Sequence, residues 1–111
     1  MKLHQILKNL QNLHPKEIDL SLSRIVKLCN KLGNPQKNLK FISVVGTNGK
    51  YSTIQAMRAI LKEEKIKCNI YTSPHIQKIN ERYIFNDIEI SDKNLEKLLV
   101  EVKEINNNDP I

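Results

Sequence analysis

A short apolar run that leads directly into two closely spaced glycines and a lysine constrains the fold of this chain most. The run is "KFISVV" at residues 40–45, and its β-branched and aromatic side chains are typical of a buried parallel strand. Apolar side chains then recur at helical spacing, at Ile54, Met57, Ile60 and Leu61. A second strand-like stretch, "KCNIYT", follows at residues 67–72. Together these patterns predict one βαβ unit with a right-handed crossover.

Two helices are predicted before this unit. Leucine and isoleucine recur at helical spacing over residues 3–13, and Pro15 should stop the first helix. A second amphipathic helix is predicted over residues 20–32, with Gly33 placed to end it.

A hairpin and a last helix are predicted after the unit. The stretch "RYIFNDIEI" has two short apolar segments around Asn86 and Asp87, which indicates a two-residue hairpin turn. Ser91 can then cap an amphipathic helix over residues 92–105.

The predicted fold class is therefore α/β: N-terminal helices, one βαβ unit, a small hairpin and a final helix. The 111 residues accommodate one small domain. Within it we expect a helical lead-in over residues 1–40, a strand, loop, helix and strand over 41–72, and a loop, hairpin and helix over 73–111. Because a buried parallel strand needs neighbours on both edges, we expect the sequence to be the front part of a larger sheet domain.

The charge of the chain favours an anionic small molecule as its partner. The formal net charge is +6, with the lysines spread along the predicted helices. The most basic cluster, "KEEKIKC" at residues 62–68, is diluted by two glutamates, which favours a solvated helix end over a nucleic-acid patch. Only two phenylalanines and three tyrosines are available to stack on bases. We therefore expect no nucleic-acid partner.

The cysteines and the hydropathy pattern indicate a cytoplasmic setting. Cys29 and Cys68 stand alone, without the spacing of a zinc site or of a disulfide framework. No apolar run approaches the roughly 20 residues that a membrane span needs, and no signal-peptide pattern opens the chain. We expect a reducing compartment and no membrane partner.

The glycine-containing loop has the chemistry of a phosphate-binding site. Gly46 and Gly49 let the backbone turn tightly beside a ligand, and the N-terminus of the following helix favours an anion. Lys50 adds a positive charge for the outer phosphates of a nucleoside triphosphate, and Ser52 adds a hydroxyl. The strict Walker pattern is not met, because it requires glycine at Val44 and serine or threonine at position 51. The alternative is a glycine-rich turn without a ligand.

Three motifs in order resemble one enzyme family. They are "LGNPQ" upstream of the loop, "GTNGK" in the loop, and "SPH" with "NER" downstream of it. Over about residues 10–91 the chain resembles the N-terminal part of folylpolyglutamate synthase and dihydrofolate synthase, members of the Mur ligase superfamily. The resemblance implies the front part of a P-loop-type ATP-binding domain, without the C-terminal domain that binds glutamate in this family.

The resemblance also implies an activity. Such enzymes are ATP-dependent carbon–nitrogen ligases, in which ATP and magnesium convert a folate or pteroate carboxylate into an acyl phosphate. The amine of L-glutamate then attacks this acyl phosphate to form an amide. On its own, the chain would bind ATP weakly and would not turn over, with a complementary chain segment as a further partner. A nucleotide- or anion-binding module without catalysis and a non-functional remnant are the alternatives.

Family roles carry over to three groups of residues. The ATP-phosphate loop of the family matches Thr47, Asn48, Gly49 and Lys50. A magnesium-ligating serine matches Ser73, for which a turn serine is the plainer interpretation. A segment beside the pteroate or folate pocket matches Asp19, Leu20, Ser21 and Leu22. The plainer interpretation of Asp19 is a carboxylate at a helix start. We assign no role to His75, Asn80, Glu81 and Arg82.

Tyr51 is the main departure from the family pattern, which has glycine there. If this position requires a positive φ, a tyrosine costs about 1–3 kcal/mol of strain or blocks the ligand. If the residue lies in the first helical turn with its side chain outward, the cost is about a few tenths of a kcal/mol.

Overall fold

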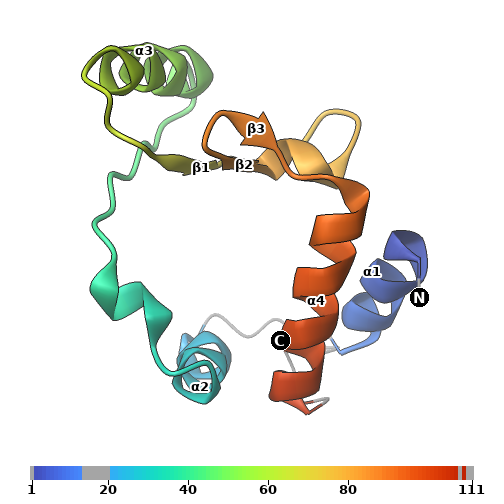
Figure 1. Cartoon of the computed structure of the whole chain (residues 1–111). Helices are drawn as coiled ribbons and strands as arrows, with labels where there is room; N and C mark the ends of the chain where they lie inside the picture. The colour runs from blue at the N-terminus through green and yellow to red at the C-terminus, as the bar shows by residue number, and fades with distance from the viewer. Residues whose placement is uncertain (1, 14–20, 108, 110–111) are drawn as a thin grey trace. The chain divides into compact units, whose positions relative to one another are not determined.

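The computed structural model describes residues 2–13, 21–107 and 109 (Figure 1). The chain divides into two compact units. Residues 40–90 form one unit, which carries the glycine-containing loop and is called the sheet unit. The chain up to Leu39 and the chain from Ser91 onward form the other, called the helical unit.

A long helix, a three-stranded antiparallel sheet and a short 3₁₀ helix make up the sheet unit. The helices are α3 (Lys50–Glu63) and the 3₁₀ helix η2 (Ile79–Arg82), and the strands are β1 (Asn69–Tyr71), β2 (Tyr83–Phe85) and β3 (Ile88–Glu89). The sheet order is β1-β2-β3, with Ile70 opposite Ile84 and Phe85 opposite Ile88. Beyond the last strand, Ile90 is buried.

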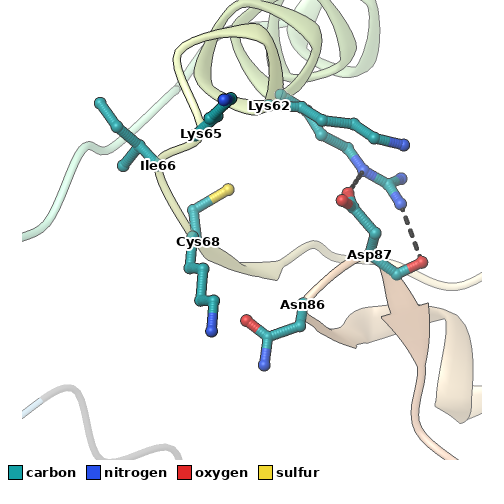
Figure 2. A pocket seen from close by; sticks show the side chains of 8 residues that line it. Lys62, Lys65, Ile66, Cys68, Asn86 and Asp87 are labelled. Carbon is teal, nitrogen blue, oxygen red and sulfur yellow. Dashed lines mark hydrogen bonds and ion pairs between the residues drawn. The ribbon is translucent and has the colours of Figure 1, made fainter.

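The predicted hairpin is confirmed. Asn86 and Asp87 connect β2 to β3, and both have a positive φ, 51° and 69°. Two central residues with positive φ are the requirement of a type I′ turn, whose twist matches that of the flanking strands. Arg58 of α3 fixes this turn to the helix. Its Nε donates to Oδ1 of Asp87 at 2.7 Å, and its Nη2 donates to the carbonyl oxygen of Asp87 at 3.2 Å (Figure 2).

The predicted first strand and its parallel pairing are absent from the residues that the structure describes. Residues 40–46 form no regular element, and the strand β1 pairs with β2 in an antiparallel ladder instead. A strand forms only where a second strand satisfies its N–H and C=O groups, and here no described segment offers that edge to residues 40–46. The side chains of Phe41, Ile42 and Val45 are consequently 68%, 70% and 88% exposed. The predicted helix and the second strand do form where the sequence indicates.

Three α-helices and a 3₁₀ helix make up the helical unit. They are α1 (Leu3–Asn12), α2 (Ser23–Lys31), the 3₁₀ helix η1 (Pro35–Asn38) and α4 (Asp92–Asn106). Both α1 and α2 pack against α4. Ile6 of α1 and Leu95 of α4 are the buried hydrophobic side chains of the described part of this unit. The two predicted N-terminal helices and the last helix are thereby confirmed, the second of them about three residues shorter at its start.

Polar caps hold the helix ends of this unit. Ser91 accepts the N–H of Asn94 at its Oγ, at 3.2 Å, as predicted for the start of α4. The carboxylate of Glu96 on α4 accepts the N–H of Leu3 at 2.9 Å. That contact satisfies an orphan donor of α1 and sets a negative charge at the positive end of its dipole.

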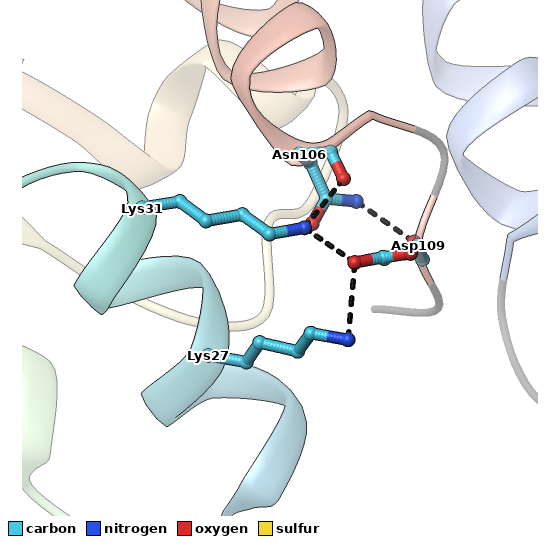
Figure 3. A network of polar contacts seen from close by, with 4 residues as sticks. All are labelled: Lys27, Lys31, Asn106 and Asp109. Atoms are coloured by element: carbon cyan, nitrogen blue, oxygen red, sulfur yellow. Dashed lines mark hydrogen bonds and ion pairs between the residues drawn. The ribbon is translucent and has the colours of Figure 1, made fainter.

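A second polar cluster joins α2 to the end of α4 (Figure 3). The Nζ of Lys31 donates to the carbonyl oxygen of Asn106 at 2.8 Å, and both Lys31 and Lys27 pair with the carboxylate of Asp109. Hydrogen bonds from Lys31 and then Lys27 hold the pKa of Asp109 below its usual value. The amide of Asn106 donates back to the carbonyl oxygen of Asp109 at 2.8 Å. The contact from Lys31 thus gives a partner to the carbonyl group of Asn106, one of those in the last turn of α4 that have no partner within the helix.

The helices α2 and α3 end with the same backbone conformation, but the left-handed residue is a glycine after α2 and a lysine after α3. After α2, Gly33 has φ +82°, and the N–H of Asn34 donates to the carbonyl of Cys29 at 2.8 Å. After α3, Lys65 has φ +58°, and the N–H of Ile66 donates to the carbonyl of Leu61 at 2.8 Å. Both ends are Schellman motifs, in which glycine is the favoured left-handed residue.

We therefore expect the substitution Lys65→Gly to stabilise the sheet unit by about 1 kcal/mol, because glycine removes the left-handed strain of a side chain. Urea unfolding followed by the signals of residues 50–63 measures this change. The matched control is Lys67→Gly, a change of the same side chain at a position without a positive φ, which should lower stability slightly. Equal effects of the two changes would contradict the strain argument.

Among the described residues, none of the helices combines the length and the apolar character needed to cross a bilayer.

Candidate functional site

The predicted phosphate loop is a turn that ends on the first residue of α3. Gly49 is the N-cap of α3 with φ +77°, and Gly46 has φ +149°. A Cβ atom built at Gly49 would meet nothing within 4 Å, and one at Gly46 would meet nothing closer than 3.9 Å. Space is therefore available at both positions, so it is the backbone conformation that requires glycine.

The N-terminus of α3 presents backbone donors outward. The first helical bond is from the N–H of Thr53 to the carbonyl oxygen of Gly49 at 3.0 Å, and the Thr53 hydroxyl donates to the same oxygen at 2.8 Å. No side chain caps this end. The N–H groups of Lys50, Tyr51 and Ser52 thus have no intrahelical partner, and they lie at the positive end of the helix dipole. This arrangement favours an anion.

The six residues predicted to bind ATP lie within this single turn and the first turn of α3. Thr47, Asn48 and Ser52 are exposed, and Lys50 is half-buried at the first helical position. Their placement is local, so the turn brings them together without help from distant parts of the chain. A flexible ammonium group at Lys50 can follow the outer phosphates of a nucleotide.

Tyr51 lies in the first turn of α3, and its side chain is 69% exposed. Its φ is not positive. Of the two alternatives that the sequence left open for the backbone, the helical one is therefore found, and tyrosine causes no left-handed strain at this position.

The other predicted site residues lie elsewhere. Ser73 is exposed and precedes Pro74 across a cis peptide bond, and among the described residues no hydrogen bond joins it to the phosphate loop. Ser21 shares a hydrogen bond with Ser23 at 2.9 Å between their hydroxyl oxygens, and Leu22 is 72% exposed. Asp19 and Leu20 lie outside the described residues.

A divalent cation does not fit Ser73 alone. In the ranges that the structure describes, no three His, Cys, Asp or Glu side chains gather where they could hold a metal ion. A hard cation such as magnesium takes about six oxygen ligands, of which one serine hydroxyl is a weak member. Phosphate oxygens and further protein oxygens would have to complete such a site.

Glu81, for which no role was predicted, organises the loop that follows Ser73. Its carboxylate accepts the N–H of Ile76 at 2.8 Å, of Gln77 at 3.2 Å and of Lys78 at 3.0 Å. The hydrogen bonds from Ile76 and Lys78 contribute most to lowering the pKa of Glu81 below its ordinary value. Lys78 is the N-cap of η2 and Glu81 its third residue, but the Ser or Thr that signals such a capping box in a sequence is missing, so no sequence pattern pointed to Glu81.

The neighbouring Arg82 closes the same loop from the other side. Its Nε donates to Nδ1 of His75 at 2.8 Å, while its carbonyl oxygen accepts the N–H of Thr72 at 3.0 Å. Glu81 and Arg82 are neighbours in the 3₁₀ helix η2, and none of the described ion pairs joins them. Each instead binds a different part of residues 72–78.

We expect acid to loosen this loop before it affects the helices. Because the folded-state pKa of Glu81 is lowered, its contribution to loop stability is complete above the ordinary pKa of 4.5 and is lost as the pH falls through the lower folded value. The protection factors of the amides of Ile76, Gln77 and Lys78, which correct their exchange rates for the intrinsic effect of pH, should fall over this range. The variant Glu81→Gln should show fast exchange at neutral pH and no such acid step. An unchanged acid step in that variant would contradict the assignment to Glu81.

Comparison with known proteins places this geometry in a family. No family model matches the chain. The dihydrofolate synthase/folylpolyglutamate synthase of Bacillus subtilis (strain 168) is 39% identical over 82 residues, which are 74% of this chain and 19% of the relative. The chain is related to the folylpolyglutamate and dihydrofolate synthases. It spans about a fifth of the length of this synthase, and the match falls in the N-terminal part of the family.

Solved synthase structures confirm the fold. A bifunctional folylpolyglutamate synthase/dihydrofolate synthase from Yersinia pestis, complexed with AMPPNP and a Mn ion, superposes with a TM-score of 0.87 at 26% identity. The match covers 100% of this chain and 27% of that one. A folylpolyglutamate synthase in complex with AMPPCP and folate gives a TM-score of 0.82 at 30% identity, over 95% of this chain and 26% of that one. The predicted Mur ligase fold class is thereby confirmed.

Proposed function

We propose that this chain provides the ATP-phosphate loop of an ATP-dependent ligase that joins L-glutamate to a folate or pteroate carboxylate. One observation carries the proposal: the uncapped N-terminus of α3, with Gly49 in a left-handed conformation before it and Lys50 as its first residue. The two solved relatives bind ATP analogues, and one binds folate as well. A site for phosphate groups is what this loop offers chemically.

The proposed reaction activates a poor electrophile. The carboxylate of the folate or pteroate attacks the γ-phosphorus of ATP, the bond to the β-phosphate oxygen breaks, and ADP leaves. The amine of glutamate then attacks the acyl phosphate, losing a proton as the amide forms and inorganic phosphate leaves. Catalysis of phosphoryl transfer is mostly positioning and charge stabilisation, so the protein holds phosphates rather than forming covalent bonds.

Each group of candidate residues has a role in this proposal. Backbone N–H groups after Gly49 and the ammonium of Lys50 hold the β- and γ-phosphates, and Ser52 adds a hydroxyl. Gly46, Thr47 and Asn48 shape the turn. Ser73 would supply one hydroxyl ligand to a magnesium ion, which would offset charge on the transferring phosphoryl group, and oxygens of ATP would be needed as further ligands. The border of the pteroate or folate pocket is assigned to Asp19, Leu20, Ser21 and Leu22.

The proposal also covers the cellular compartment and the small-molecule partners. Cys29 and Cys68 are free thiols, which suit a reducing compartment such as the cytoplasm. The small-molecule partners are ATP, folate or dihydropteroate, and L-glutamate.

A chimeric enzyme tests the function directly. The stretch of the B. subtilis synthase that matches this chain is replaced by the sequence of this chain, and ADP release that depends on both glutamate and a pteroate or folate is measured. We expect turnover, and a second chimera with Tyr51→Gly shows how far the tyrosine slows it. A folded chimera that is inactive with either residue at position 51 would overturn the proposal.

The alternative is a phosphate-binding module without catalysis. It is favoured by the lack, within the described residues, of side chains that could complete a metal site around Ser73. Tight binding of ATP by the 111-residue chain, together with inactive chimeras, would select this alternative.

A further inference from the structure

A second cationic site lies at the opposite end of α3 from the phosphate loop. A cavity of ≈ 330 Å³ opens between the last turns of α3, the segment that follows it and the hairpin turn. This volume is at the lower end of the roughly 300–1,000 Å³ typical of small-molecule sites. Figure 2 shows the side chains around it, and they are Arg58, Lys62, Lys65, Ile66, Lys67, Cys68, Asn86 and Asp87.

The lining has a surplus of positive charge. Four of its side chains are cationic, and Asp87 is the single anionic one. Asp87 already has a cationic partner, because its carboxylate accepts a hydrogen bond from the Nε of Arg58 at 2.7 Å. That hydrogen bond, followed by the charges of Arg58 and Lys62, lowers the pKa of the Asp87 carboxyl. Three lysines are therefore left around one cavity, and among the described residues none of them has an ion-pair partner. Glu63 and Glu64 follow in the chain but do not line the cavity.

The chemistry of these cations selects the kind of anion. A guanidinium can bind a carboxylate through two parallel hydrogen bonds, but the Nε and Nη2 of Arg58 already donate to Asp87. Ammonium groups act as point charges with rotatable donors, which suit the oxygens of phosphate. Asn86 adds one neutral polar residue to the lining. Three separate point charges favour the dense charge of a phosphate group over the single, more widely spaced charges of carboxylates.

The cavity is separate from the phosphate loop. Lys62 is twelve residues after Lys50 on the same α-helix, which is about 18 Å at 1.5 Å per residue. One phosphate group cannot contact both lysines. We propose that this pocket at the C-terminal end of α3 binds a small phosphate-bearing molecule, independently of the ATP-phosphate loop.

Cys68 makes the proposal testable, because its half-buried thiol lines the cavity while Cys29 lies in the helical unit. The probe is tripolyphosphate, without metal ions, and the reporter is the reaction of each thiol with the neutral reagent 4,4′-dithiodipyridine. A bound anion shields Cys68, so its rate should fall about tenfold when the probe is at roughly nine times its Kd. The rate of Cys29 should not change.

Three variants and one competing anion decide the result. The pair Lys62→Gln and Lys67→Gln should abolish the protection of Cys68, whereas the matched pair Lys93→Gln and Lys97→Gln on α4 should retain it. Lys50→Ala should retain it as well, so that failure of the ATP loop and failure of this pocket are distinguished. Triglutamate at the same concentration should protect little. Unchanged amide signals of residues 50–63 verify that the sheet unit of each variant is folded, and an unchanged Cys29 rate does the same for the helical unit.

The proposal is overturned by any of four results. These are no protection in the parent chain, protection that survives the loss of Lys62 and Lys67, protection that disappears in Lys50→Ala, and equal protection by triglutamate. The third would assign the anion to the phosphate loop, and the last would reduce the pocket to an unselective cluster of charge.

Discussion

Lys50→Ala is expected to weaken the binding of Mg-ATP to this chain by about ten- to a hundred-fold. The reason is that the substitution removes the cationic donor from the phosphate loop while leaving its backbone intact. Hydrogen bonds to charged groups contribute about 1.5–3 kcal/mol, and about 1.4 kcal/mol is a factor of ten in Kd. Calorimetric titration of the parent and of the variant measures the difference.

Two further variants separate the effect of Lys50 on ATP binding from a general loss of charge and from the effect of Tyr51. Lys97→Ala on α4 makes the same chemical change away from the loop and should leave the Kd of ATP unchanged. Tyr51→Gly reports on the side chain that precedes Ser52. If the parent does not bind and only Tyr51→Gly does, the exposed tyrosine blocks the phosphates even though its backbone is helical. Equal Kd values for the parent and Lys50→Ala would refute the role assigned to Lys50.

Ile6→Ala is expected to destabilise the helical unit by about 2–5 kcal/mol, the range for truncating a large buried aliphatic side chain. Ile6 is completely buried, and Leu95, 3% exposed, is the other buried hydrophobic residue of the described helical unit. A core this small has few other contacts to offset the cavity. Total stabilities of small domains are about 5–15 kcal/mol, so this one change removes a large share.

Urea unfolding followed by helical circular dichroism measures the loss. Ile25→Ala on α2 is the matched control, because it deletes the same atoms from a side chain that is 52% exposed. Its effect should be less than half as large. If the two changes cost the same, burial of Ile6 does not determine the stability of this unit.

Local patterns predicted most of the elements. The helices follow from apolar spacing and from their caps at Ser91 and Gly33, and the hairpin follows from Asn86 and Asp87, which tolerate positive φ. The segment at residues 40–46 has the composition of a strand, yet composition cannot supply a neighbouring strand. Strand formation depends on pairing with a distant edge, so the prediction was wrong for these residues within the described chain.

The residues of the candidate site likewise fall into those that local sequence patterns could predict and those that depend on contacts made on folding. Residues 46–52 could be predicted together because one turn and one helix end place them. Glu81 was missed because its three partners appear only when residues 76–78 fold back over its carboxylate. The roles of Ser73 and of Asp19–Leu22 depend on contacts across longer distances in the chain, which neither spacing nor propensity determines.

The discontinuous make-up of the helical unit has a consequence for synthesis on the ribosome. Leu3 of α1 finds its partner, Glu96, only 93 residues later in the chain. At about 5–20 residues per second, α1 waits roughly 5–20 s after its own synthesis before α4 exists to cover it. The sheet unit ends at residue 90 and is therefore complete only shortly before α4. Ile6, which is completely buried in the folded protein, therefore lacks the helix that α1 packs against throughout this interval.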